Sequence, residues 1–157
     1  MPTFNTSAGH SVPHCHVRSH PISPCSASEW TSAQKQLKRA LMAAAFPNAV
    51  EVLLPSRKYN CHGYVYTGAH GWFGFPDLFI ADDFFQVSMA SAQVDDVLVY
   101  EDDVEITHSA FVDQVTGGVI RKVRSKWGKM AAFIHDPTDV PGEYGRPVRL
   151  IRRNVPN

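Results

Sequence analysis

Two residues of this chain could form a thiol nucleophile and its base: Cys61 and His108. Cys61 lies in the run YNCHGYVY (59–66), at a turn before apolar residues, and His108 lies in ITHSA (106–110). Cysteine attacks carbonyl carbons as the thiolate, and a nearby imidazole lowers the thiol pKa enough to supply that form. Because the two residues must meet in space, the elements that carry them decide the interpretation. The alternative is that Cys61 is a small buried apolar residue.

The segment from Cys61 to Tyr66 predicts the start of a helix, with the cysteine at its N-terminus. The free N–H groups and the positive dipole end at that position stabilise a thiolate. They can also hold the oxyanion that forms when a carbonyl is attacked. The loop that follows, 68–76, is rich in glycine and aromatic residues and could line a substrate groove.

From Val94 onward the pattern is that of β-strands, at 97–100, 105–112 and 119–125. A Thr-Gly-Gly run (116–118) before β-branched residues predicts a hairpin that joins the second of these strands to the third. The apolar stretches 133–134 and 148–151 could add strands.

The hairpin register decides which residue lies opposite His108. If the turn is formed by the threonine and the first glycine, His108 faces Ser125; if it is formed by the two glycines, His108 faces Trp127. Opposed side chains lie on the same face, with Cβ atoms about 5 Å apart. A polar group there would fix the imidazole tautomer that leaves Nε2 free for the thiol. Ser125 is the first choice for this third catalytic residue, and His135 is the second. Asn60 and the acidic residues of the turn at 101–105 are further alternatives.

Four further residues are predicted to bind the substrate or the oxyanion, because they flank the nucleophile or the imidazole. They are Tyr59, Asn60, His62 and Trp127.

The motifs around both reactive residues resemble the NlpC/P60 group of papain-like cysteine peptidases and amidases. The family has an Asp-Cys-Ser-Gly helix start, a Gly-Asp-Leu-Val-Phe-like strand and a His-Val-Gly-Ile-like strand. Here NCHG (60–63), DDVLVY (95–100) and HSAFV (108–112) occupy those places. The resemblance covers residues 59–128. It implies an α+β fold of papain-like NlpC/P60 type, with N-terminal helices packed on a small antiparallel β-sheet.

The resemblance also implies an activity: hydrolysis of an amide bond, with Cys61 as nucleophile, His108 as base and no cofactor. The implied substrate class is peptidoglycan peptide. An antibacterial effector or toxin domain, with an immunity protein as its partner, would fit a chain of this size. Two alternatives stay open. The same dyad could deamidate or acylate a protein glutamine, or the domain could be a non-enzymatic binding module with a papain-like scaffold.

The bulk properties fit one domain of ordinary composition. The 157 residues are 44% hydrophobic and 19% charged, and 15 basic side chains balance 15 acidic ones. Nothing in this balance favours nucleic acid as a partner. No apolar run approaches the roughly 20 residues that span a bilayer. The N-terminus lacks the pattern of a secretory signal, so the compartment stays undefined: cytoplasmic, or delivered by a specialised secretion system.

Residues 1–27 are rich in Ser, Pro and His and are interpreted as a flexible leader to a catalytic domain at 28–157. The leader holds Cys15, Cys25 and several histidines, but it has no spacing that fixes a metal geometry, so we expect no metal site. The two cysteines could pair under oxidising conditions. After the leader, a helix is expected from about Ser28, the first choice of N-cap with Thr31 as an alternative, to Phe46. A second helix is expected within 77–89.

Overall fold

The computed structural model describes residues 4–14 and 28–154. In chain order its elements are α1 (Ser32–Ala45), β1 (Val50–Leu53), α2 (Cys61–Tyr66), α3 (Asp77–Asp83), β2 (Phe84–Val87), the 3-10 turn η2 (Met89–Ser91), β3 (Val97–Glu101), β4 (Ile106–Thr116), β5 (Val119–Lys126), β6 (Ala132–His135), the 3-10 turn η3 (Gly142–Tyr144) and β7 (Arg146–Arg153). Within the described residues no helix is both long and apolar enough to cross a bilayer.

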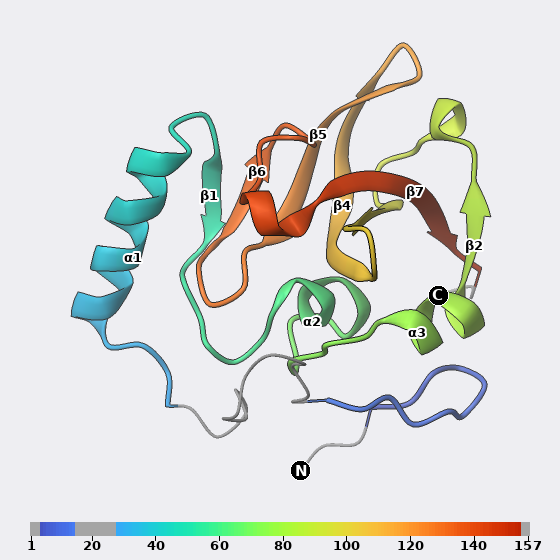
Figure 1. Cartoon of the computed structure of the whole chain (residues 1–157), viewed down its shortest axis with the longest axis horizontal. Coiled ribbons are helices and arrows are strands. Elements are labelled where there is room, and N and C mark those ends of the chain that lie inside the picture. The colour runs from blue at the N-terminus through green and yellow to red at the C-terminus, as the bar shows by residue number, and fades with distance from the viewer. Residues whose placement is uncertain (1–3, 15–27, 155–157) are drawn as a thin grey trace.

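The strands form a single antiparallel sheet in the order β1-β6-β5-β4-β3-β7-β2. Figure 1 shows α2 and α3 together below the sheet, while α1 stands beside the edge strand β1. The predicted α+β architecture with an antiparallel sheet is confirmed. The helix start at Cys61 and the hairpin of β4 and β5 also agree with the prediction.

Strand β3, which lies between β4 and β7, is buried on both faces and divides the core in two. Val97 and Val99 pack with Val65 and Tyr66 of α2 on one face. The alternate residues of β3, together with Ala110 and Val112 of β4, pack on the opposite face. Because successive side chains of a strand point to opposite faces, each strand residue near the site belongs either to the α2 side or to the far side.

Helix α1 covers part of the far side. It begins one turn later than Ser28, because Thr31 makes a reciprocal capping box with Gln34. At its other end, Met42 and Phe46 pack against a cluster that contains Trp127 and Phe133.

The expected helix within 77–89 is shorter than predicted. It ends at Asp83, and the next four residues form β2, which pairs with β7. The sequence Phe-Phe-Gln-Val suits a strand, and pairing with an edge of the sheet satisfies its backbone.

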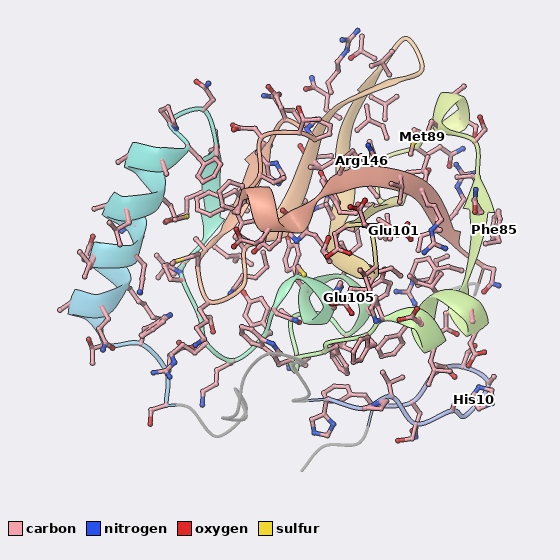
Figure 2. The ribbon with its side chains drawn as sticks, in the orientation of Figure 1. His10, Phe85, Met89, Glu101, Glu105 and Arg146 are labelled. Carbon is pink, nitrogen blue, oxygen red and sulfur yellow. The ribbon has the colours of Figure 1, made fainter. Side chains whose placement is uncertain are left out.

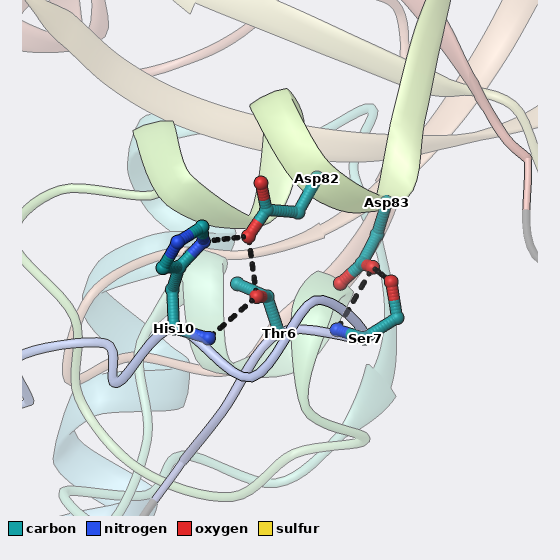
Figure 3. A network of polar contacts seen from close by, with 5 residues as sticks. All are labelled: Thr6, Ser7, His10, Asp82 and Asp83. Atoms are coloured by element: carbon teal, nitrogen blue, oxygen red, sulfur yellow. Dashed lines mark hydrogen bonds and ion pairs between the residues drawn. The ribbon is translucent and has the colours of Figure 1, made fainter.

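Residues 4–14, expected to be part of a flexible leader, are packed against the domain instead. Thr6 and His10 both hydrogen-bond to Asp82, the latter at 2.6 Å, and Ser7 hydrogen-bonds to Asp83. Figure 3 shows these contacts tying the segment to α3. Val12 is only 2% exposed and belongs to the core beneath α2. The leader prediction therefore does not hold for this segment, while residues 15–27 lie outside the described part of the chain.

Candidate active site

A pocket of about 360 Å³ opens where α2 begins. Cys61 and His62 of α2 lie in its wall, with Trp72 and Phe75 from the loop after that helix and Tyr144 from η3. The loop predicted to line a groove therefore does line the pocket. Three carboxylate side chains, those of Asp102, Glu105 and Glu143, complete an acidic and aromatic lining. Figure 2 shows Glu105 close to α2.

Local hydrogen bonds fix the start of α2. Asn60 is the N-cap, and its Oδ1 accepts from the N–H of Gly63 at 3.0 Å. Its Nδ2 donates to the carbonyl of Phe73 at 2.7 Å, which binds the aromatic loop to the helix. Only glycine fits at position 63, because a Cβ there would lie 2.1 Å from the Gly71 carbonyl oxygen. Cys61, the first residue of the helix, is thereby held in a defined place.

The Cys61 thiol lies between the pocket and β4, with 5% of the residue exposed. Burial raises the pKa of this thiol to about 11. Backbone hydrogen bonds, including those from Ser109 and His62, and the charge of Lys126 act in the other direction and lower the pKa of the thiol. The sulfur therefore faces two backbone donors and a cation, all of which favour the thiolate.

His62 is the imidazole that shares the pocket with Cys61. Its Nδ1 lies 3.0 Å from Ser109 Oγ, which in turn lies 3.1 Å from the hydroxyl of Tyr66. Burial lowers the pKa of His62 to about 3, so the ring is neutral. Both Cys61 and His62 thus contact the same residue, Ser109, one through its backbone and the other through its side chain.

His108 lies on the far side of β4. It pairs with Tyr100 across the strands, and its ring stacks on Tyr144 with centroids 4.1 Å apart and planes 5° apart. The residue is fully buried, and neither ring nitrogen has a hydrogen-bond partner among residues 4–14 and 28–154. Burial, with smaller effects from His135 and His62, places its pKa well below the ordinary value. The predicted contact between this imidazole and the Cys61 thiol is not made.

The predicted third residues bond to each other rather than to His108. Gly117 and Gly118 form the hairpin turn, which is the register that sets His108 opposite Trp127. Ser125 Oγ lies 2.7 Å from His135 Nε2 and accepts from the Trp127 indole N–H at 2.9 Å. His135 Nδ1 bonds to the Asp136 carbonyl. Ser125 therefore does not orient His108, because the serine's hydrogen bonds are all within this far-side cluster.

Strand alternation explains this arrangement. Ser109, not His108, points toward α2. Phe111 of β4 pairs with Arg124 of β5, so two residues further along the hairpin Ser109 lies opposite Lys126. Lys126 is fully buried. The α2 side of the site thus consists of Cys61, His62, Ser109 and Lys126, while the predicted His108 and Ser125 lie on the other face.

Lys126 and Ser109 were missed by the sequence interpretation, although the hairpin alternation could have singled them out as the pair one position away from His108 and Ser125. Two of the predicted binding residues take structural parts. The half-buried Tyr59 gives its carbonyl and ring face to Lys126, and Trp127 is buried in the far-side cluster.

No metal centre is found within residues 4–14 and 28–154, where no group of three or more His, Cys, Asp or Glu side chains is suitably placed. Cys15 and Cys25, and two of the four leader histidines, His16 and His20, lie outside those ranges.

Comparison with known proteins finds no matching family model, no matching curated protein and no matching solved structure. The interpretation of the site therefore depends on its geometry.

Proposed function

We propose that this domain is a cysteine hydrolase of amide bonds, of a papain-like type that resembles the NlpC/P60 group, with Cys61 as its nucleophile. One observation carries the proposal. Cys61 is the first residue of a helix in a pocket wall, beside an imidazole, that of His62, whose Nδ1 is fixed by Ser109. A thiol, a neutral ring and backbone donors in one pocket are the groups that acyl transfer needs.

In the proposed reaction the thiol proton passes to Nε2 of His62 while the sulfur attacks the carbonyl carbon, because burial disfavours a separate thiolate and imidazolium. This tautomer requires that Nδ1–H donates to Ser109 Oγ. Helix N–H groups stabilise the oxyanion that the attack forms. The imidazolium gives its proton to the leaving amine, which leaves a thioester. Water, deprotonated by the same nitrogen, hydrolyses that thioester and regenerates the thiol.

His108 remains the base that the family resemblance implies. Tyr144 stacks on its ring and also lines the pocket, so this ring would have to move before His108 could meet a substrate. His62 is preferred because it reaches the pocket without such a change.

The lining favours a substrate with a basic group near the scissile amide. The carboxylates of Asp102, Glu105 and Glu143 would attract a cation, and Trp72 and Phe75 are aromatic residues in the same lining, a kind that binds cations. Peptidoglycan peptide, which the resemblance implies, carries amino groups of this kind. An immunity protein as partner stays a prediction.

The test is incubation of the protein with peptidoglycan fragments and with a panel of basic and acidic peptides, followed by mass spectrometry. We expect cleavage products from peptidoglycan fragments or basic peptides, and at least a 10⁴-fold slower rate in Cys61→Ala. A double variant, Cys15→Ser with Cys25→Ser, is the matched control, because it removes the other two thiols and keeps Cys61. A gain of about one mass unit without cleavage would indicate glutamine deamidation instead. Full activity in Cys61→Ala would contradict the proposal.

A further inference from the structure

Lys126 is a buried cation without a carboxylate partner among the described residues. It is the last residue of β5 and is fully buried. No ion pair joins it to an Asp or Glu side chain in the described part of the chain. A buried charge is costly unless it is paired and hydrogen-bonded. The groups that contact Lys126 therefore indicate what stabilises its charge.

The hydrogen bonds of Lys126 favour its ammonium form. Its Nζ donates to the carbonyls of Ser56 at 2.8 Å, Tyr59 at 3.1 Å and Gly128. These three acceptors match the three N–H groups of an ammonium, whereas a neutral amine has only two. Burial acts in the other direction and lowers the pKa of Lys126 to about 7. The carbonyls supply dipoles but no net charge, so the cation still lacks an anion.

The thiol of Cys61 is the ionisable group placed to supply that anion. Lys126 contacts the Tyr59 carbonyl, in the turn that leads directly into α2, and Gly128, which lines the pocket with Cys61. The charge of Lys126 lowers the pKa of the thiol, and the thiolate raises the pKa of the lysine. The two groups therefore stabilise each other's charged forms.

The other titratable groups around the pair do not replace it. Tyr66 and Tyr144 are phenols whose pKa burial raises, and His62 is held neutral, so none of them carries charge near neutral pH. Glu29 acts on Lys126 more weakly than Cys61 does. Its carboxylate accepts from Ser56, Arg57 and Trp30.

We propose that Lys126 is a positioning residue whose buried ammonium stabilises the negative charge that develops on the Cys61 sulfur, in addition to any proton transfer by an imidazole. The lysine also binds the turn before α2 to the end of β5, so the same contact places the sulfur. This inference rests on the proposed role of Cys61 as nucleophile. It assigns to a lysine the activation that the sequence predicted for a histidine.

The test is the pH dependence of iodoacetamide alkylation of Cys61, with Cys15 and Cys25 replaced by serine. In Lys126→Met the apparent thiol pKa should rise by at least one unit, which slows alkylation at pH 7 about tenfold. Lys122→Met is the control, since this lysine lies on the same strand but is partly exposed and paired with Asp136 at 2.6 Å. An unchanged profile in folded Lys126→Met would overturn the proposal. Equal hydrolysis by the parent protein and by Cys61→Ala would instead count against Cys61 as nucleophile.

A reciprocal measurement decides the matter even if Lys126→Met does not fold. Cys61→Ala removes the anion, so the pKa of Lys126, followed by NMR of its side-chain nitrogen, should fall relative to the parent protein. The same lysine pKa in both proteins would show that the two groups are not coupled and would overturn the proposal.

Discussion

The two sides of the sheet at β4 and β5 hold buried polar groups of different kinds. On the α2 side, Cys61, His62 and Lys126 meet around Ser109 beside an open pocket. On the far side, Ser125, His135 and Trp127 satisfy one another within a closed core. Burial is nearly complete on both sides, so burial alone does not mark function. Access to the pocket and an unbalanced charge distinguish the α2 side.

His108 is the exception on the far side, because both its nitrogens lack hydrogen bonds within the part of the chain that the structure describes. A buried polar atom without a partner costs about 1–3 kcal/mol. Its neighbour His135, on the same side, has both nitrogens bonded. His135 therefore stabilises the core through its hydrogen bonds, whereas His108 does not.

The largest expected effect comes from exchanging the two candidate bases. His62→Gln should slow amide hydrolysis by about 10²–10⁴-fold, because it removes the imidazole in the pocket. His108→Gln should change the rate only a few-fold. Both are measured by initial rates on the best substrate, with Gln chosen because it preserves a polar group. The opposite ranking would assign catalysis to the far side, with Tyr144 displaced during turnover.

Acidification should destabilise the fold through three buried histidines, His62, His108 and His135. Burial lowers all three pKa values below the 6.5 of an exposed ring. Below pH 6.5 the unfolded chain therefore binds more protons than the folded one, and the free energy of unfolding decreases as pH falls. Each ring contributes up to about 1.4 kcal/mol per pH unit.

Denaturant titrations between pH 7 and pH 4.5 measure this slope. His62→Gln should remove the contribution of one titrating ring to this slope. The double variant His108→Phe, His135→Phe should remove the contributions of two rings. A flat profile in the parent protein would contradict neutral buried rings.

The two far-side histidines should respond in opposite directions to the same substitution. His108→Phe keeps the stack on Tyr144 and removes two unsatisfied nitrogens, so the free energy of unfolding should rise by about 1–3 kcal/mol. His135→Phe leaves Ser125 Oγ and the Asp136 carbonyl without their hydrogen-bond partner, so the free energy of unfolding should fall by a similar amount. Urea denaturation at pH 7.5 gives both values. Destabilisation by both would mean that His108 has partners in solution.

The smallest effect concerns the cap that places Cys61. Asn60→Ala removes the acceptor for Gly63 and the donor to Phe73, at a cost of about 1–2 kcal/mol in unfolding free energy. Asn60→Asp, which keeps the cap acceptor but loses the donor, should cost less. Thermal and urea denaturation of both variants check this, and equal losses would show that the cap bond to Gly63 contributes little.

Local sequence signals predicted several elements well. The helix start at Cys61, strand β3 and the Gly-Gly turn all follow from short-range patterns. Strands β1 and β2 were not predicted, because they form only through pairing with β6 and β7 far along the chain. The packing of residues 4–14 depends in the same way on Asp82 and Asp83.

The positions of the site's side chains were harder to predict from the sequence than the elements that carry them. Hairpin geometry placed His108 beside the segment that holds Ser125 and Trp127, but it did not say which face of that hairpin α2 would cover. Since side chains alternate, a change of one residue moves a group to the other side of the sheet. The helix covers Ser109 and Lys126. The papain-like assignment and the hydrolase activity stay predictions.

The most direct test of the account is brief labelling at pH 6 with iodoacetamide, in a variant whose only thiol is Cys61. The account predicts one adduct at Cys61, whose formation is slowed in His62→Gln and unchanged in His108→Gln. Equal labelling rates in the parent protein and in His62→Gln would show that this imidazole does not act on Cys61 and would contradict the account.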